Sequence, residues 1–437
     1  MTRLTLALSL LLIGCGDKDS SEPSSGGGGG DTAGGGGGPG GGGPGGGGSD
    51  TDGGSDTSGG TDQPPLSMGF VVEPGELPEL RVATFRHNAS EVVFLDGDDD
   101  ALYRFTIEDG LEVVEALDED EVFLSYNTPV LSSSGLSWQY YNTSGTHSDY
   151  FTMLKTHDST GPVGVPTDDD WPLVAGVLDG EAYVTWDNPE DTVRTQLWRV
   201  PADGSSPEHI SYAGNDNPAL LQLLPQSSGG GLLPIVHCGD DYQDQLLVVD
   251  GTDLVELGPV AYHFAPTGGD LAVSTSLIAW SHRDGGSVEW RDYYVSDGDD
   301  VRKVGGTEAW LQEYSLRGEG NYVLWGDVSE EEPYSSRRSL MLYNWDTDTS
   351  VQIFQGTEKE QLGNADVDAQ GRVAYIVTDG EASRIYLWEA GDQQLVTSSE
   401  WHDETFSTSC EYFSLLEDHL FCGHRSVNGW IGQIGSE

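Results

Sequence analysis

The sequence predicts an all-β fold, a β-propeller of eight blades with seven as the alternative, and three observations carry this prediction. Residues 66–437 consist of short runs rich in Val, Leu, Ile, Trp and Tyr, broken by Gly, Asp, Asn and Pro, without a capped helical pattern. Similar runs recur, each taken as the first strand of a repeat, and they begin at Val92, Leu136, Ala182, Leu232, Leu277, Tyr322, Val373 and His419. Their spacings are 44, 46, 50, 45, 45, 51 and 46 residues. A four-stranded blade needs roughly 40–50 residues, so the period predicts one blade per repeat.

The two ends of the repeat region complement each other. The last repeat stops soon after Trp430 and lacks an outer strand, whereas Met68–Glu73 precedes the first repeat and belongs to none. We predict that Met68–Glu73 completes the last blade, which would remove both free sheet edges. Seven blades would result if Ser132–Thr156 formed some other structure.

The N-terminus has the features of a secretion signal. Leu4–Ile13 is an apolar run of ten residues that follows one positive charge. It is too short to cross a bilayer as a helix, which needs about 20 residues, and has the length of a signal-peptide core. The following Gly14-Cys15 resembles a bacterial lipobox, which implies removal of residues 1–14 and lipidation of Cys15. The alternative is an ordinary signal peptide that happens to contain a cysteine.

Residues 15–65 are expected to form a disordered linker, followed by a propeller domain over residues 66–437. Between Gly26 and Gly48, 18 of 23 residues are glycine, and such a segment cannot bury enough apolar surface to fold. About 50 residues of this kind have an r.m.s. reach of about 40 Å. The expected protein is therefore anchored in the bacterial cell envelope, at the outer membrane, with its domain held away from the lipid. Whether that domain lies on the periplasmic or the outer side stays open.

The charge excludes two classes of partner. The chain has 74 Asp and Glu against 19 Lys and Arg, a net charge of −55. No basic surface is left for nucleic acid, or for a polybasic contact with anionic lipid. The acids are spread through all repeats, which favours a solvated, salt-adapted surface over a dedicated acidic site. No cofactor is expected, and the charge leaves room only for weak surface binding of Ca²⁺.

One segment carries a family resemblance. Asn364–Ser398 contains the turn Asp368-Ala369-Gln370-Gly371 and the β-prone run Val373–Tyr375, followed by Ile385–Leu387 and Leu395–Thr397. It resembles the TolB-like, WD40-like propeller repeat, which implies that these three runs are the inner, next and outer strands of a blade. The resemblance also implies protein partners in the envelope. The separate N-terminal domain of TolB has no counterpart in residues 15–65, so its particular partners are not carried over.

The sequence contains no recognisable catalytic or metal-binding motif. Its ten histidines are scattered about one per repeat, without ligand spacing. Four acidic clusters do not fit a calcium loop and are better explained as turns between strands; they are Asp96–Asp100, Asp168–Asp170, Asp297–Asp300 and Asp366–Gly371. No catalytic residue and no metal ligand is therefore predicted.

The aromatic residues recur at matching positions, which predicts core packing rather than a sugar-binding platform. The recurring residues are Trp138, Trp186, Trp280 and Trp325 near the ends of the first strands, and Trp198, Trp290, Tyr343 and Trp388 in the next ones. Three tryptophans fall outside the pattern and are expected in loops, namely Trp171, Trp310 and Trp401.

Cys410 and Cys422 flank an expected hairpin that turns at Glu417-Asp418. That register places Cys422 opposite Phe413, so a disulfide with Cys410 requires a bulge or a Cys410 outside the strand. An oxidising envelope would permit the bond, and the sequence leaves it open. Cys238 is expected to be a small buried hydrophobe.

Two functions follow from this description. The first is a non-catalytic scaffold, expected to be monomeric, that binds an envelope protein or glycan through loops at one end of the propeller. The alternative is a propeller-type hydrolase or lyase that uses carboxylates near the axis. Buried Asp, Glu and His converging at the axis would favour the enzyme, and an axis of small and apolar residues would favour binding.

Overall fold

The computed structural model of this chain describes most of the repeat region. The described residues are 65–80, 85–97, 101–123, 129–143, 149–156, 160–162, 173–186, 196–201, 203, 205–210, 221–223, 232–237, 245–259, 271–282, 290–308, 316–328, 338–357, 359–402, 407–408, 410–425 and 429–435. The predicted signal peptide, Cys15, Cys238 and nearly all of the predicted linker lie outside them. No helix among the described residues is long and apolar enough to cross a membrane.

The repeat region forms eight antiparallel sheets, the blades of a propeller, so the eight-bladed prediction is confirmed. Blade 1 has β2 (Arg86–His87), β3 (Glu91–Leu95), β4 (Ala101–Thr106) and β5 (Gly110–Ala116). Blade 2 has β6 (Glu121–Phe123), β7 (Val130–Ser132), β8 (Gly135–Asn142), β9 (Asp149–Lys155) and β10 (Thr160–Pro162). Blade 3 has β11 (Leu173–Leu178), β12 (Glu181–Trp186), β13 (Gln196–Val200) and β14 (Glu208–Ile210). Blade 4 has β15 (Leu221–Leu223), β16 (Pro234–His237), β17 (Gln245–Asp250) and β18 (Asp253–Pro259).

The other four blades follow in chain order. Blade 5 has β19 (Leu271–Val273), β20 (Ile278–His282), β21 (Trp290–Ser296) and β22 (Val301–Glu308). Blade 6 has β23 (Arg317–Glu319), β24 (Tyr322–Val328), β25 (Arg338–Asn344) and β26 (Thr349–Gln355). Blade 7 has β27 (Gln361–Val367), β28 (Val373–Thr378), β29 (Ser383–Glu389) and β30 (Asp392–Ser398), and the 3-10 turn η1 (Ser399–Trp401) follows it. Blade 8 has β31 (Tyr412–Leu416), β32 (His419–Gly423) and β33 (Trp430–Ile434), together with β1 (Met68–Val72).

The closing strand lies where the sequence predicts it. Strand β1 pairs antiparallel with β33, with Met68 opposite Ile434 and Phe70 opposite Gly432. The segment Ser132–Thr156 supplies β8 and β9 of blade 2 and so removes the seven-blade alternative. The start and the end of the propeller therefore share one sheet, in which β1 covers the edge of β33 that would otherwise be unpaired.

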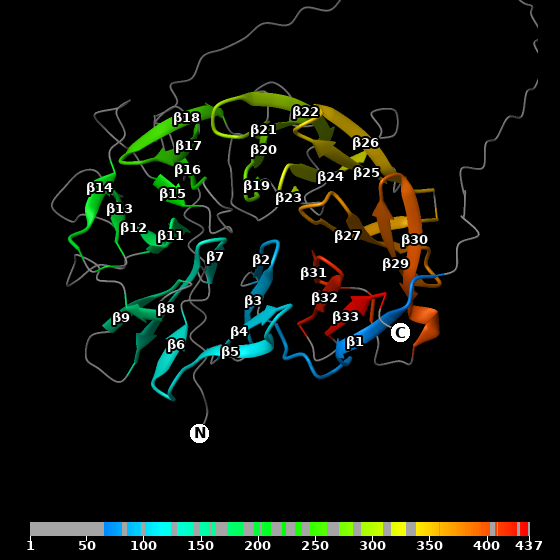
Figure 1. Ribbon diagram of the computed structural model, residues 1–437, viewed down its shortest axis with the longest axis horizontal. Helices are drawn as coiled ribbons and strands as arrows, with labels where there is room; N and C mark the ends of the chain where they lie inside the picture. The colour runs from blue at the N-terminus through cyan, green and yellow to red at the C-terminus, as the bar shows by residue number, and fades with distance from the viewer. Residues whose placement is uncertain are drawn as a thin grey trace, which may run out of the picture. The chain divides into compact units, whose positions relative to one another are not determined.

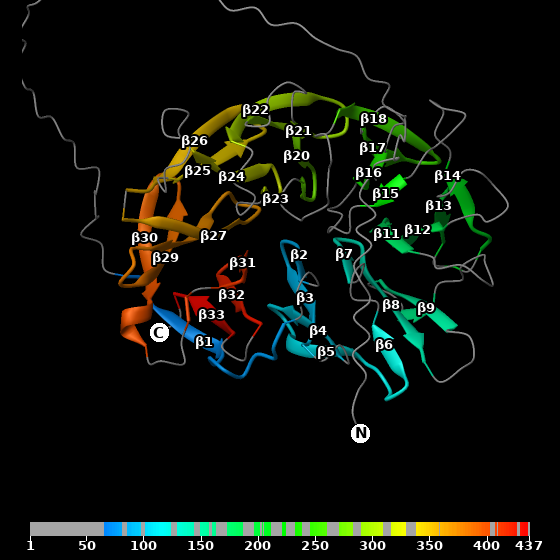
Figure 2. The same cartoon turned by 180° about the vertical axis from the view of Figure 1, so that it is seen from behind.

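One strand assignment in the sequence analysis was wrong. The recurrent apolar runs are the second strands of the blades, not the first. In blade 7 the innermost strand is β27, while Val373–Tyr375 belongs to the second strand β28. Both views of the ring show β2, β7, β11, β15, β19, β23, β27 and β31 toward its centre (Figures 1 and 2). The first strands escaped detection because several have only two or three residues, too few to show a period.

Every pair of neighbouring blades is joined by buried apolar side chains. One cluster joins Leu324 and Leu342 of blade 6 to Val373 and Tyr375 of blade 7, and equivalent clusters lie between all the other neighbours. Burying one large side chain of this kind stabilises the fold by about 2–3 kcal/mol. Because the clusters run from each blade to the next and from blade 8 to blade 1, they close the ring.

The aromatic predictions are confirmed where the side chains are described. Trp138, Trp280, Trp325 and Tyr343 are at most 2% exposed, whereas Trp401 is 51% exposed. Trp198 and Trp388 are half-buried against these clusters. Trp171 and Trp310 lie outside the described residues, as do the side-chain environments of Trp186 and Trp290.

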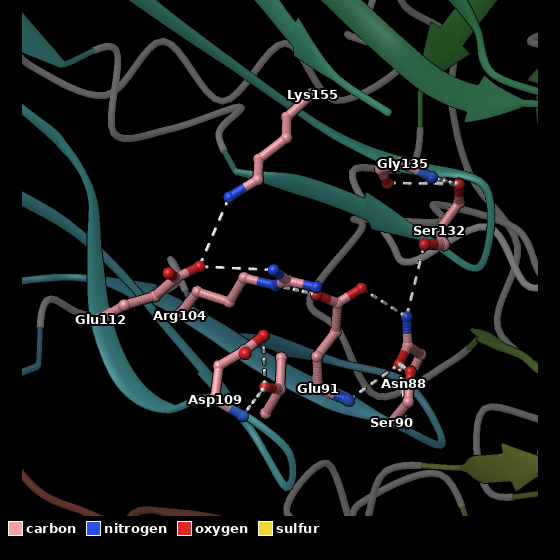
Figure 3. A network of polar contacts seen from close by, with 10 residues as sticks. Asn88, Ser90, Glu91, Arg104, Asp109, Glu112, Ser132, Gly135 and Lys155 are labelled. Atoms are coloured by element: carbon pink, nitrogen blue, oxygen red, sulfur yellow. Dashed lines mark hydrogen bonds and ion pairs between the residues drawn. The ribbon is translucent and has the colours of Figure 1, made fainter. Parts of the chain in front are cut away.

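Polar contacts reinforce the contact between blades 1 and 2 (Figure 3). Asn88 donates from Nδ2 to the backbone oxygen of Ser132 at 3.3 Å. Further out, Glu112 accepts from Arg104 of its own blade at 3.3 Å and from Lys155 of blade 2 at 3.4 Å. These bonds join the two sheets at their polar positions, while the apolar cluster between blades 1 and 2 supplies most of the attraction.

The last blade also contains a disulfide. Phe413 lies opposite Cys422, the register expected from the sequence. Cys410 precedes β31 and is joined to Cys422, with a Cα–Cα distance of 5.1 Å. Because Cys410 lies outside the strand, the bond forms without a bulge in the β31–β32 ladder.

Candidate functional site at the propeller axis

Polar side chains cluster on the innermost strands of four successive blades. Arg317 of blade 6, Asp366 of blade 7, Ser414 of blade 8 and Arg86 of blade 1 lie opposite equivalent residues of their second strands. Each lies three residues before the turn that leads into that second strand. The four positions are therefore at one level of the ring, and we call this set, with His87 and Glu319, the axial cluster.

The same level is apolar or small in other described blades. Val130 of blade 2, Gly176 of blade 3 and Ala272 of blade 5 take the corresponding positions. The axis is thus polar along blades 6, 7, 8 and 1 and apolar along much of the remainder. Buried Asp366 and Glu319, with His87, form the lining that was expected to favour an enzyme. The small and apolar residues of blades 2, 3 and 5 form the lining that was expected to favour binding.

Asp366 is the anionic centre of the axial cluster. Its side chain is 2% exposed, and its Oδ2 accepts a hydrogen bond of 2.8 Å from the Leu415 backbone N–H of the next blade. The same oxygen lies 3.7 Å from Nδ1 of His87 in blade 1. A carboxylate that is buried and bonded in this way is held in one orientation, so Asp366 supplies a fixed negative charge at the axis.

His87 borders Asp366 and is half-buried. Its pKa is lowered chiefly by burial; Asp366 opposes this effect, while the nearby charges of Arg317 and Arg86 add to it. The imidazole is therefore neutral at neutral pH and can donate one hydrogen bond and accept another. Because the charges of Arg86 and Arg317 both lower this pKa, the two guanidinium groups lie near the same imidazole.

Arg86 and Arg317 contribute the positive charge. Burial lowers the pKa of Arg86 to about 10, with Tyr412 acting in the opposite direction. Burial also lowers the pKa of Arg317, against the pull of Asp366. Both side chains are half-buried and remain charged at neutral pH. Each donates from Nη1 to the preceding backbone oxygen, at 2.7 Å for Arg86 and 3.4 Å for Arg317.

Glu319 lies two residues beyond Arg317 and is the last residue of β23. It is 6% exposed, and burial raises its pKa to about 7. The hydrogen bond from the Gly320 N–H, 3.0 Å long, opposes this rise, while the charges of Asp366 and Asp368 add to it. A carboxyl group with this pKa exchanges a proton near neutral pH, as a general acid or base must.

The acidic clusters behave largely as turns, which confirms that prediction where they are described. Asp297 accepts through Oδ1 from the backbone N–H groups of Asp299 and Asp300. Asp368 accepts in the same way from Gln370 and Arg372. Asp366 is the exception, because it lies in strand β27 rather than in the turn predicted for Asp366–Gly371. Asp98–Asp100 and Asp168–Asp170 lie outside the described residues.

Sequence reasoning missed the axial residues for a definable reason. Arg86 and Arg317 occur in strands of two and three residues, and neither belongs to a motif. The available signal was a short polar segment before the apolar runs of blades 1 and 6, namely Arg86–Asn88 and Arg317–Glu319. Of the ten histidines, His87 belongs to the axial cluster. The part of the chain that the structure describes includes no group of three or more His, Cys, Asp or Glu that could hold a metal.

No protein-family model and no curated protein matches this sequence. Among solved structures, the chain is similar to the propeller domain of the trilobed protease from Pyrococcus furiosus, with 11% identity, a TM-score of 0.39 and coverage of 71% of this chain and 96% of that one. It is also similar to the WD40 domain of SCAP from fission yeast, with 7% identity, a TM-score of 0.46 and coverage of 84% and 98%. An oligogalacturonate lyase in complex with manganese matches with 11% identity, a TM-score of 0.39 and coverage of 82% and 98%. With identities and TM-scores this low, none of them carries an argument about function. The eight-bladed β-propeller is established by the chain's own sheets.

Proposed function

We propose that this chain is a lipid-anchored protein of the bacterial cell envelope whose propeller binds a partner, without catalysis, at the axial cluster. The observation that supports it is the convergence of half-buried Arg86 and Arg317 with buried Asp366 on innermost strands. Such strands are held in place on both sides by neighbouring blades, so these charges are preorganised. In a chain of net charge −55, a site with two arginines is electrostatically distinct from the rest of the surface.

One detail favours binding over catalysis at this site. Asp366 is 2% exposed and already accepts the Leu415 N–H, so its carboxylate is occupied in holding the strands together. The arginines are half-buried rather than fully buried and cannot act as bases at neutral pH. The cluster is thus better suited to holding a charged group than to moving a proton.

A propeller-type hydrolase or lyase is the second candidate, because Glu319 has a pKa of about 7. In this candidate, Glu319 and neutral His87 supply the acid and the base. Turnover of a glycan or ester substrate that is lost in Glu319→Gln, with the partner binding unchanged, would establish this candidate.

The binding proposal is tested by crosslinking and capture of the lipidated full-length protein from intact cells at native salt. We expect one recurrent envelope protein or glycan that is lost when Arg86 and Arg317 are both changed to Ala. The control is Arg425→Ala, since Arg425 is 59% exposed and pairs with Glu411 away from this register level. No enriched partner, or equal capture by both variants, would refute a binding role for the axial cluster.

The anchor is tested separately. Cys15→Ser should move the protein from the membrane fraction to the soluble fraction and remove the mass of its acyl chains, because several chains are needed for stable anchoring. A soluble wild-type protein without acyl chains would overturn the lipoprotein part of the proposal and leave the axial site unaffected.

A further inference from the structure

We infer that the axial cluster is a receptor for a single carboxylate group, with Arg317 as its main contact and Arg86, His87 and Ser414 completing it. This inference rests on the proposed binding function and names the chemical class that the site takes.

Arg317 differs from most other described arginines, because those arginines form ion pairs. Six arginines each lie within salt-bridge distance of an Asp or Glu of this chain, namely Arg104, Arg199, Arg302, Arg372, Arg384 and Arg425. Arg317 has no ion pair among the described residues, and its buried Nε has no hydrogen-bond partner there. Its described hydrogen bond, to the Leu316 backbone oxygen, is 3.4 Å long. In a chain with 74 acidic residues, an arginine kept without an ion pair at the axis is positioned for an anion from outside.

A second polar group at the same level is also unused. Ser414 is 0% exposed, and its Oγ has no hydrogen-bond partner among the described residues. Ser414 has the same register position in β31 as Arg317 in β23, two blades away. A buried hydroxyl without a partner costs about 1–3 kcal/mol, a penalty that a bound acceptor removes.

The charge of the cluster selects a monoanion. Arg86 and Arg317 are positive, Asp366 is negative, and burial keeps His87 neutral, which leaves one positive charge before ligand binds when Glu319 is protonated. One carboxylate neutralises it. A phosphate dianion would add a surplus negative charge beside Asp366 and Glu319, and a metal cation would be repelled by both arginines. The planar guanidinium fork also matches the two oxygens of a carboxylate.

The test uses acetate as the probe on the full-length protein in detergent, with chloride and sulfate as comparison anions at constant ionic strength. NMR titration of carbon-13-labelled acetate should show saturable binding at one site per chain. Arg317→Gln should weaken it at least tenfold, because a charge-assisted pair is lost. Arg317→Lys, which keeps the charge without the fork, should weaken it less, and Arg425→Gln should leave it unchanged.

A measurement on the wild-type protein keeps the inference testable if the variants fail to fold. Phenylglyoxal modifies accessible arginines, and mass spectrometry locates the product. Acetate should slow modification of Arg317 several-fold and leave modification of Arg425 unchanged. Absence of acetate binding, tighter binding of sulfate or chloride, or equal protection of both arginines would each overturn the carboxylate site.

These outcomes are distinguishable from failure of the proposed function. A partner that is captured through Arg86 and Arg317, in a protein that does not bind acetate, would keep the binding role and discard the carboxylate. Acetate binding without a captured partner would keep the site and direct the search to small carboxylic acids.

Discussion

At the scale of single residues, the structure shows how burial at the axis changes the chemistry of ordinary side chains. Arg86, Arg317, Glu319 and His87 all have pKa values displaced first by loss of hydration. The displaced groups lie on strands whose neighbours pack tightly on both sides. The packing of the blades therefore holds these groups partly or fully away from water, and the apolar clusters between blades offset the cost.

Glu319 makes stability depend on pH in a predictable direction. Its pKa is 4.5 ordinarily and about 7 in the fold. Below 4.5 it is protonated in both states; between 4.5 and 7 the unfolded chain loses the proton first, so stability falls as pH rises. The accumulated loss is on the order of 3 kcal/mol above pH 7. Glu319→Gln should therefore be more stable than wild type at about pH 8 and equal to it at about pH 4.

Urea unfolding of both proteins at the two pH values measures this difference. The other carboxylates titrate alike in both proteins, so comparing them isolates Glu319. A difference that stays constant with pH would show that Glu319 is not the group responsible.

Gly371 offers a second test at this scale. Its φ is +78°, and a Cβ placed there would lie 2.5 Å from Cε1 of Tyr322 in the neighbouring blade. Gly391 also has a positive φ, +99°, but has nothing within 4 Å of that position. Gly391→Ala should cost about 1 kcal/mol from backbone strain alone, and Gly371→Ala at least about 1 kcal/mol more because of the clash. Equal losses in thermal or urea unfolding would contradict a close approach between blades 6 and 7 here.

At the scale of elements, the order of strands within each blade depends on length as much as on composition. The second strands are apolar and five to eight residues long in β3 and β8, and their pattern is visible in the sequence. The first strands β2 and β23 have two and three residues and are defined only by pairing with the next strand. The apolar pattern of the sequence is therefore enough to locate the second strands, whereas the first strands can be recognised only by their hydrogen bonding to the second strands.

The closing strand should be essential to the last blade. Removing residues up to Glu73 would expose the edge of β33 and the apolar surface that Met68 and Phe70 cover. We expect a lower melting temperature and concentration-dependent association for that truncation. A truncation that ends at Pro64 keeps β1 and should behave like wild type. Identical melting curves for the two truncations would show that β1 does not stabilise blade 8.

At the scale of the whole propeller, charge and ring closure act against each other. Apolar clusters join every neighbouring pair of blades, whereas a net charge of −55 makes the folded chain repel itself. Raising NaCl from about 0.05 M to about 1 M shortens the Debye length from over 10 Å to about 3 Å. The melting temperature should therefore rise with salt.

The control for this salt effect is the same titration near the calculated isoelectric point, about 4.1, where net repulsion is small. We expect little dependence on NaCl there, as measured by calorimetry. A melting temperature that falls with salt at neutral pH would mean that ion pairs such as Arg199–Glu181 outweigh the repulsion.

The sequence by itself determined the propeller, its blade number, the closing strand and the recurrent tryptophans, because each depends on a pattern that repeats along the chain. The period near 46 residues and the spare run Met68–Glu73 are of this kind. Only the tertiary structure decided the axial cluster. Arg86 and Arg317 are over 200 residues apart in the chain. They act on the same imidazole only because the closed ring places blade 1 next to blade 8, so that the innermost strands of blades 6, 7, 8 and 1 follow one another around the axis. No local pattern encodes that proximity, since it results from closing the ring.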